Sequence, residues 1–191
     1  MNDLDERIAA ALERVGQALR GQLWDAAKRH GRTPTQVQVL VGLGGERPDL
    51  HRVGALAAEF DVTHPTISDA LAALRRKGLV AAAGRRDPLT LTPRGRDVTR
   101  ELTGWDERTR AQLTALPAAD KEATLRTLLE LVAGLQRAGV ITVARMCTSC
   151  RHFRRQARPG SAKPHYCALL ETPLADAELR VDCPEHELDA A

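Results

Sequence analysis

Residues 52–91 constrain the fold of this 191-residue chain more than any other segment. One short helix is predicted at about residues 52–59. A second begins after "FDVTHP", where Thr63 can cap it and Pro65 suits its first turn, and Gly78 ends it. The strand-like runs "LVAAAG" and "PLTLT" then flank the charged turn "RRDP" and predict a small hairpin. Two short helices with a tight link, followed by a hairpin, are typical of a winged helix-turn-helix.

In that arrangement the second helix, about residues 63–77, enters the major groove of double-stranded DNA, and the hairpin, about residues 79–91, is the wing. We expect polar side chains at the start of the helix to reach bases or phosphates, and basic side chains at its end and in the wing turn to contact phosphates or the minor groove. The candidate DNA-binding residues are Thr63, His64, Thr66, Ser68, Asp69, Arg75, Arg76, Arg85 and Arg86. A capped helix with solvated charges would give the same local pattern, so the prediction depends on the order of all the elements.

The remaining segments predict further helices. Residues 3–30 carry apolar side chains at spacings of three and four, and a second helix covers about 33–43. After the hairpin, a helix begins at 92 that "TGW" at 103–105 is not expected to break, and the last long helix covers about 117–139. The fold class is therefore mainly α with a small β-hairpin wing.

The segments "LAAEFDVTHPTISDALAALRRKGLV" (56–80) and "LTLTPRGRDV" (89–98), within this order of helices, resemble the MarR family of bacterial regulators over residues 1–140. The resemblance implies a winged-helix DNA-binding and dimerisation domain, a homodimer, a palindromic operator and, usually, repression of transcription. It assigns the apolar stripes at 4–23 and 113–135 to the dimer interface, and it implies a small-molecule effector that the sequence does not identify. The wing turn is shorter here than is usual in the family.

All four cysteines follow residue 146, as Cys147, Cys150, Cys167 and Cys183 in the pattern C-x2-C-x16-C-x15-C. In a reducing compartment such a cluster indicates metal binding or catalysis more often than disulfides. Apolar residues are scattered in 141–191, and a zinc ion held by four thiolates can supply the stability that so small a core lacks. We therefore predict a metal-stapled, zinc-binding C-terminal module at 141–191.

Candidate substitutes for one cysteine are His152, His165 and His186. The neighbouring Arg145, Arg151, Arg154 and Arg155 are expected to balance the charge of the thiolates, and the acidic end of the chain, 176–189, is a further candidate partner for these arginines.

Two other chemistries stay open for the cysteines. An iron-sulfur cluster also takes four cysteines with one C-x2-C pair, and Cys183-Pro184 is similar to the end of ferredoxin motifs. Redox-active thiols are the other, although no βαβ setting of the thioredoxin type surrounds Cys147. A metal or thiol enzyme that uses the winged helix only as an interaction module is the distant alternative, because the three histidines are the only general acid or base candidates nearby. We predict a regulator and not an enzyme.

Charge and hydropathy agree with this reading. The net charge of +3 and the isoelectric point of about 8.9 weakly favour a polyanionic partner. No stretch approaches the roughly 20 apolar residues that a membrane span needs, and Met1 leads into "NDLDER" instead of an export signal. We expect a cytoplasmic protein without a membrane partner.

Overall fold

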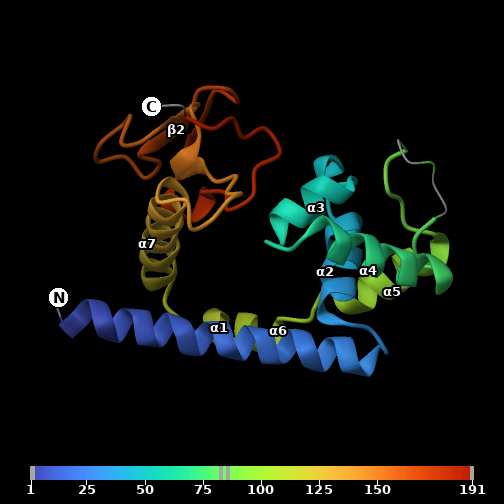
Figure 1. The fold of residues 1–191 in the computed structure, drawn as a ribbon. Helices are drawn as coiled ribbons and strands as arrows, with labels where there is room; N and C mark the ends of the chain where they lie inside the picture. The colour runs from blue at the N-terminus through green and yellow to red at the C-terminus, as the bar shows by residue number, and fades with distance from the viewer. Residues whose placement is uncertain (1–2, 82–83, 85–86, 190–191) are drawn as a thin grey trace. The chain divides into compact units, whose positions relative to one another are not determined.

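The computed structural model describes residues 3–81, 84 and 87–189, and the chain divides into two compact units, Met1–Thr114 and Ala115–Ala191 (Figure 1). The sequence predicts a domain boundary near residue 140. The division lies earlier because α7 (Ala118–Arg137) shares a hydrophobic cluster with the cysteine-containing segment. Among the described residues, no helix combines the length and apolarity that crossing a membrane requires.

The first unit is helical, in agreement with the predicted fold class. Its helices are α1 (Asp3–Arg29), α2 (Pro34–Gly44), α3 (Val53–Glu59), α4 (His64–Arg76), α5 (Pro93–Leu102) and α6 (Glu107–Thr114), with a 3-10 turn at Pro48–Leu50. One prediction was wrong: "TGW" does interrupt the helix, and α5 and α6 are separate. The N–H of Trp105 donates to the carbonyl of Leu102 over 3.1 Å, and the Trp105 side chain packs, partly buried, against the core of the unit, so the chain turns between the two helices.

Three helices of this unit start in the same way, with a threonine cap followed by proline in the first turn. The hydroxyl oxygen of Thr33 accepts from the N–H of Gln36 over 3.3 Å, and that of Thr92 accepts from Gly95 over 2.9 Å. Thr63 caps α4 in the same manner. These caps satisfy N–H groups that have no partner within the helix, which explains why the starts of α2, α4 and α5 follow the sequence prediction.

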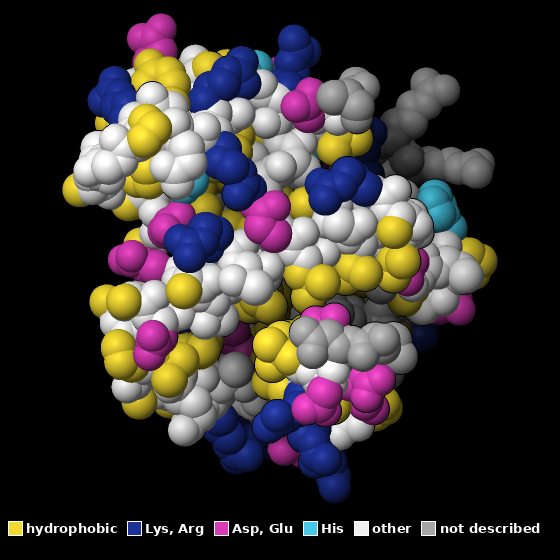
Figure 2. Space-filling model, turned by 90° about the vertical axis from the view of Figure 1, so that its left-hand side faces the viewer, with side chains coloured by type: hydrophobic (Ala, Val, Ile, Leu, Met, Phe, Trp, Pro, Cys, Tyr) yellow, Lys and Arg dark blue, Asp and Glu magenta, His cyan; other side chains and the backbone are white. Residues whose placement is uncertain are grey.

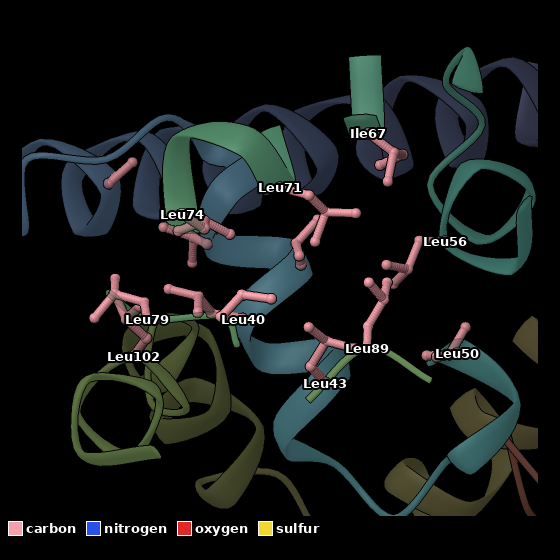
Figure 3. Close-up of a cluster of buried hydrophobic side chains, with 14 of the residues drawn as sticks. Leu40, Leu43, Leu50, Leu56, Ile67, Leu71, Leu74, Leu79, Leu89 and Leu102 are labelled. Atoms are coloured by element: carbon pink, nitrogen blue, oxygen red, sulfur yellow. The ribbon is translucent and has the colours of Figure 1, made fainter. Parts of the chain in front are cut away.

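The core of the first unit lies between α2, α4, α5 and the residues that flank the wing, and Figure 3 shows its leucine side chains directed toward one another. Leu40, Leu56, Ile67 and Leu74 are completely buried. Burial of this kind contributes about 1.5–3 kcal/mol for each large apolar side chain. The apolar side chains of α3 and α4 are therefore buried in the core, and the opposite face of α4 is exposed to solvent.

An antiparallel bridge joins Val80 and Leu91 at the base of the wing, and the predicted turn around 85–86 lies outside the described residues. Leu79 is fixed against α5, because its carbonyl accepts from the N–H of Thr92 over 3.0 Å. A Cβ at Gly95 would come within 1.9 Å of that carbonyl oxygen, so this close approach requires glycine.

The second unit contains α7 and a small antiparallel sheet. The strands are β1 (Phe153–Arg154), β2 (His165–Cys167) and β3 (Thr172–Leu174), in the order β1-β2-β3, with short 3-10 turns at Cys147–Ser149 and Asp176–Glu178. The register pairs Phe153 with Cys167 and His165 with Leu174. This sheet was not among the elements that the sequence predicts.

The cluster that holds the second unit together is small. Leu129 and Ala133 of α7 pack with Met146, Cys147 and Leu179, and Leu125 and Val132 of the same helix lie at its edge. The hydroxyl of Thr148 donates to the carbonyl of Leu129 over 3.3 Å. One face of α7 is thus covered by the cysteine-containing segment of the same chain.

Candidate DNA-binding surface and cysteine pocket

The first turns of α4 present polar side chains to solvent above a buried apolar face. Thr63, His64, Thr66, Ser68 and Asp69 are all exposed, whereas Ile67, Ala70, Leu71 and Leu74 are buried. The alternation follows from the helical period, because the buried residues lie three or four positions apart. The five predicted contact residues at the start of α4 therefore lie where a partner can reach them.

Two of these residues also hold the helix start together. The hydroxyl oxygen of Thr63 accepts from the N–H of Thr66 over 3.3 Å, and the two hydroxyl oxygens lie 2.9 Å apart. Thr63 is consequently the N-cap of α4 and supports the helix. The hydroxyl of Ser68 is not engaged in any of the hydrogen bonds identified among the described residues, so Ser68 is the simplest candidate for a contact with a base or phosphate.

At the basic end of α4, Lys77 differs from its two neighbouring arginines, because its ammonium group makes a hydrogen bond within the first unit. Arg75 and Arg76 are exposed, but the ammonium group of Lys77 donates to the carbonyl of Gly31 over 2.8 Å. Partial burial, together with the nearby guanidinium groups of Arg32 and Arg76, lowers the pKa of Lys77 below its usual value. Of the predicted wing contacts, Arg85 and Arg86 lie outside the described residues, so their placement is not tested.

Charge is mixed over the molecular surface that Figure 2 depicts, where basic, acidic and apolar side chains are interspersed. Basic side chains do not dominate the face that this view shows. The relevant feature is the arrangement of short polar side chains at the start of a helix whose other face is buried.

The four cysteines come together. Cys147, Cys150, Cys167 and Cys183 line a single pocket of about 100 Å³ in the second unit, and all four are free thiols. Burial raises the pKa of Cys147, and the other three cysteines raise it further, because they lie near enough for their negative charges to disfavour a fourth. Residues up to 36 positions apart in the sequence thus converge on one place, as the metal prediction requires.

The sulfur atoms are not arranged as a complete metal site. Within the described part of the chain, no group of three or more His, Cys, Asp or Glu side chains is arranged so that it could hold an ion. Tetrahedral coordination by thiolates requires sulfur-to-metal distances of about 2.3 Å, so the thiols of this pocket would have to move toward a common centre. The donor set and the enclosed position fit a metal that prefers sulfur, such as zinc.

The three candidate histidines differ in their placement. Only His152 lines the cysteine pocket, and its Nε2 lies 3.3 Å from a carboxylate oxygen of Glu187. His165 is buried and its Nε2 contacts Asp176 over 2.9 Å, while His186 Nε2 lies 3.0 Å from the hydroxyl of Ser149. His165 and His186 therefore make contacts with Asp176 and Ser149 and do not line the cysteine pocket.

The arginines that the sequence assigns to charge balance contact carboxylates or main-chain carbonyls. Arg151 pairs with Glu187, which confirms an ion pair with the acidic end, and Arg155 pairs with Glu130 of α7. Arg154 donates to the carbonyls of Arg151 and Phe153, and Arg145 donates to those of Cys183 and Pro184.

Arg180, which the sequence analysis missed, donates to two of the cysteine sulfur atoms. Its main-chain N–H lies 3.2 Å from Cys147 Sγ, and its Nη1 lies 3.5 Å from Cys183 Sγ. In the sequence, the hint of this role was that Arg180 lies three residues before Cys183.

Apolar side chains on α1 are exposed within the single chain. Leu4, Ile8, Leu12 and Val15 retain 56%, 49%, 37% and 50% of their accessible surface. On α7 the predicted interface stripe is divided: Leu129 is buried against the cysteine-containing segment, whereas Leu128 and Leu131 are exposed. The family resemblance assigns this whole stripe to a dimer interface, but Leu129 packs against residues of the same chain.

The order of helices, with α3 and α4 followed by the bridged segment at Val80 and Leu91, defines the first unit as a winged-helix domain, and comparisons with known proteins agree. Residues 30–88 match the model of the MarR family. The MarR family protein Rv2887 of Mycobacterium tuberculosis is 26% identical with a TM-score of 0.51, and the similarity covers 66% of this chain and 95% of that one. The structure of Rv2887 in complex with DNA gives 28% identity, a TM-score of 0.52, and coverage of 64% and 95%.

A third structure, MepR of Staphylococcus aureus, described as a transcription regulator of the multidrug efflux pump MepA, shares the fold at 22% identity, with a TM-score of 0.51 and coverage of 67% and 98%. No curated protein matches the chain. These relatives are covered almost completely while about a third of this chain is not. The comparisons support a winged-helix domain of the MarR type and assign nothing to the cysteine pocket.

Proposed function

We propose that the chain is a DNA-binding transcriptional regulator of the MarR type and that α4 is its recognition helix. The observation that carries the proposal is the exposed polar start of α4 above a fully buried apolar face. The complex of Rv2887 with DNA supports it, since that protein shares the fold. Repression is the mode of action we expect from the resemblance, and a small-molecule effector stays a prediction from the same source.

DNA binding is tested with a duplex selected by the parent protein from a random library, followed by fluorescence anisotropy. Thr66→Ala, Ser68→Ala and Arg86→Ala should each weaken binding, by about 1–3 kcal/mol for a lost base contact and less for a phosphate contact. Thr127→Ala removes an exposed hydroxyl from α7 and is the matched control. If all three variants bind as tightly as the parent, α4 and the wing do not read DNA.

We propose further that two copies of the chain associate through the exposed stripe of α1. Four large apolar side chains along one helix leave an apolar surface that a second copy can cover. Ile8→Glu and Val15→Glu should shift the mass measured by light scattering from dimer to monomer, whereas Arg14→Glu, which changes charge beside the stripe, should not. A parent protein that is monomeric at all concentrations, or Glu variants that stay dimeric, would exclude this interface.

For the second unit we propose a metal site formed by the four cysteines, with zinc as the metal and a structural or sensing role. The support is the shared pocket of the four free thiols and the small apolar cluster around it. A bound zinc ion would supply cross-linking free energy, of order 10 kcal/mol in small zinc peptides, to a unit whose own core is limited.

Metal analysis and the absorption spectrum of protein purified without oxygen test the site. One zinc per chain and no colour support the proposal, and Cys150→Ser should lower the metal content. A brown protein with iron and sulfide would identify an iron-sulfur cluster instead. Metal-free protein whose thiols oxidise reversibly would favour the thiol-based redox alternative.

A further inference from the structure

Arg180 occupies a place between the two ends of the cysteine pattern. It follows Leu179, which is buried in the cluster with Leu129 and Ala133 of α7, so its main chain is held by the core of the unit. The carbonyl of Arg180 accepts from the N–H of Cys147 over 3.1 Å, and the N–H of Arg180 lies 3.2 Å from the sulfur of the same cysteine. These reciprocal contacts set the position of Cys147 Sγ at the wall of the pocket.

The side chain of Arg180 turns to the other end of the pattern. Its Nη1 lies 3.5 Å from Cys183 Sγ and 3.1 Å from a carboxylate oxygen of Glu185, which orients the guanidinium. Cys183 itself is tied to the first cysteine segment, because its N–H donates to the carbonyl of Arg145 over 2.8 Å. One residue therefore contacts two of the four sulfur atoms that line the pocket, one through its main chain and one through its side chain.

The two N–H contacts from Arg180 restrict where the sulfur atoms of Cys147 and Cys183 can lie. A zinc ion with four thiolates carries a formal charge of about −2, and a nearby guanidinium lowers the cost of holding that charge in a partly buried pocket. The guanidinium is suited to this role, because it stays protonated and has several donors in a fixed plane. Arg151, beside Cys150, pairs with Glu187 and does not line the pocket, whereas Arg180 lines the pocket and its partner Glu185 lies 3.3 Å from Cys183 Sγ.

We propose that Arg180 is the positioning residue of the cysteine site: it fixes the sulfur atoms of Cys147 and Cys183 at the wall of the pocket and offsets the negative charge of a metal bound by four thiolates. The inference depends on the metal site proposed above and adds a residue outside the ligand set. The charge that offsets the thiolates would then come from the segment between Leu179, in the core of the second unit, and Cys183.

The test uses the full-length chain and measures affinity for Zn²⁺ by competition with a chromophoric chelator. Arg180→Gln removes the charge and the reach to Cys183 and should weaken zinc binding by about 10- to 100-fold, the usual effect of losing a group that orients a metal ligand. Arg180→Lys keeps the charge and should recover part of the loss. Arg151→Gln makes the same change in charge at an arginine beside Cys150 that does not line the pocket, and should alter the affinity by less than about 3-fold.

A spectroscopic readout separates positioning from general stability. With Co²⁺ in place of Zn²⁺, four-thiolate coordination gives strong sulfur-to-metal charge-transfer and visible absorption bands, and these bands should weaken or shift in Arg180→Gln but not in Arg151→Gln. Arg180→Lys should lie between the two, and it remains informative if Arg180→Gln does not fold.

The outcomes distinguish the two proposals. If the parent binds one metal ion per chain, and Arg180→Gln equals Arg151→Gln in affinity and in Co²⁺ spectrum, Arg180 has no positioning role, whereas the metal site stands. If the parent binds no metal, both the site and the role of Arg180 are wrong. A selective loss in Arg180→Gln with partial rescue by lysine establishes the role.

Discussion

Among the described residues, the hydrophobic cluster of the first unit contains sixteen buried side chains, whereas that of the second contains five, one of which is Cys147. The second unit adds links of another kind: Arg126 pairs with Asp176, Arg155 with Glu130, and Lys163 with Glu178. Ion pairs at the surface are screened by solvent and do not replace an apolar core. The first unit thus has a substantial apolar core of its own, and the metal site proposed for the second unit would add a cross-link where the apolar core is small.

Metal removal should give the largest difference between the two units. With a zinc chelator, amide hydrogen exchange in β1, β2 and β3 should become fast, while α2, α4 and α5 of the first unit keep their protection, because only the second unit loses the stabilisation by the metal. Exchange measured by mass spectrometry, peptide by peptide, checks this, and added excess zinc is the control. Protection of the three strands that is unaffected by the chelator would mean that the small core is sufficient.

A core substitution in the first unit should give the next largest effect, and here the first unit should be destabilised while the second is not. Leu71→Ala removes a side chain that is 1% exposed, and should destabilise the first unit by about 2–5 kcal/mol. Ser68→Ala, on the exposed face of the same helix, should change stability by less than about 0.5 kcal/mol. Chemical denaturation followed by circular dichroism checks both. Equal stabilities of the two variants would show that α4 does not pack as described.

The contrast between the units also explains what the sequence could predict. The starts of α2, α4 and α5 depend on local chemistry, a threonine cap with a following proline, and each was predicted. The break between α5 and α6 was not, because it depends on Trp105 packing against residues that are distant in sequence. In the second unit, the sequence pattern led us to group the four cysteines together, and they do line one pocket; that they bind a metal stays a prediction.

Other features of the second unit depend on contacts between distant segments. The use of one face of α7 by the cysteine-containing segment and the approach of Arg180 to two sulfur atoms join parts of the chain that the amino-acid pattern does not relate. Periodicity identified the apolar stripe of α7 correctly, but it carries no information on whether a partner chain or the same chain covers it.

The buried contact between His165 and Asp176 should contribute less than the metal or the leucine core. Asp176→Ala leaves the Nε2 of a 2% exposed histidine without a partner, and should cost the second unit about 1–3 kcal/mol. Arg126→Ala removes only the more exposed partner of Asp176 and should cost less than about 1 kcal/mol. Thermal unfolding of the metal-loaded protein compares the two, and equal losses would assign the effect to the ion pair instead.

The pH dependence of this contact has a defined sign. The hydrogen bond from His165, with a smaller contribution from Arg126, lowers the pKa of Asp176 below its ordinary value of 3.8. A carboxyl group with a lowered pKa in the folded chain adds stability that is complete above its unfolded pKa and is lost as the pH falls through the folded one. The stability difference between the parent and Asp176→Asn should thus be constant between about pH 5 and 7 and shrink below about pH 4. A difference that already changes near pH 6 would point to another titrating group.

The smallest effect concerns Thr63, which caps α4 and was also predicted to contact DNA. Thr63→Ala removes the cap and should cost the first unit about 1 kcal/mol, seen as a lower unfolding temperature. Thr63→Asp keeps a side-chain acceptor for the N–H of Thr66, so its stability should match the parent, but its negative charge at the start of the recognition helix should repel phosphates and weaken DNA binding. Thr63→Asn is the uncharged control with the same capping ability. If the Asp and Asn variants bind the selected duplex equally well, the start of α4 does not face the DNA backbone, and Thr63 serves the fold of the first unit alone.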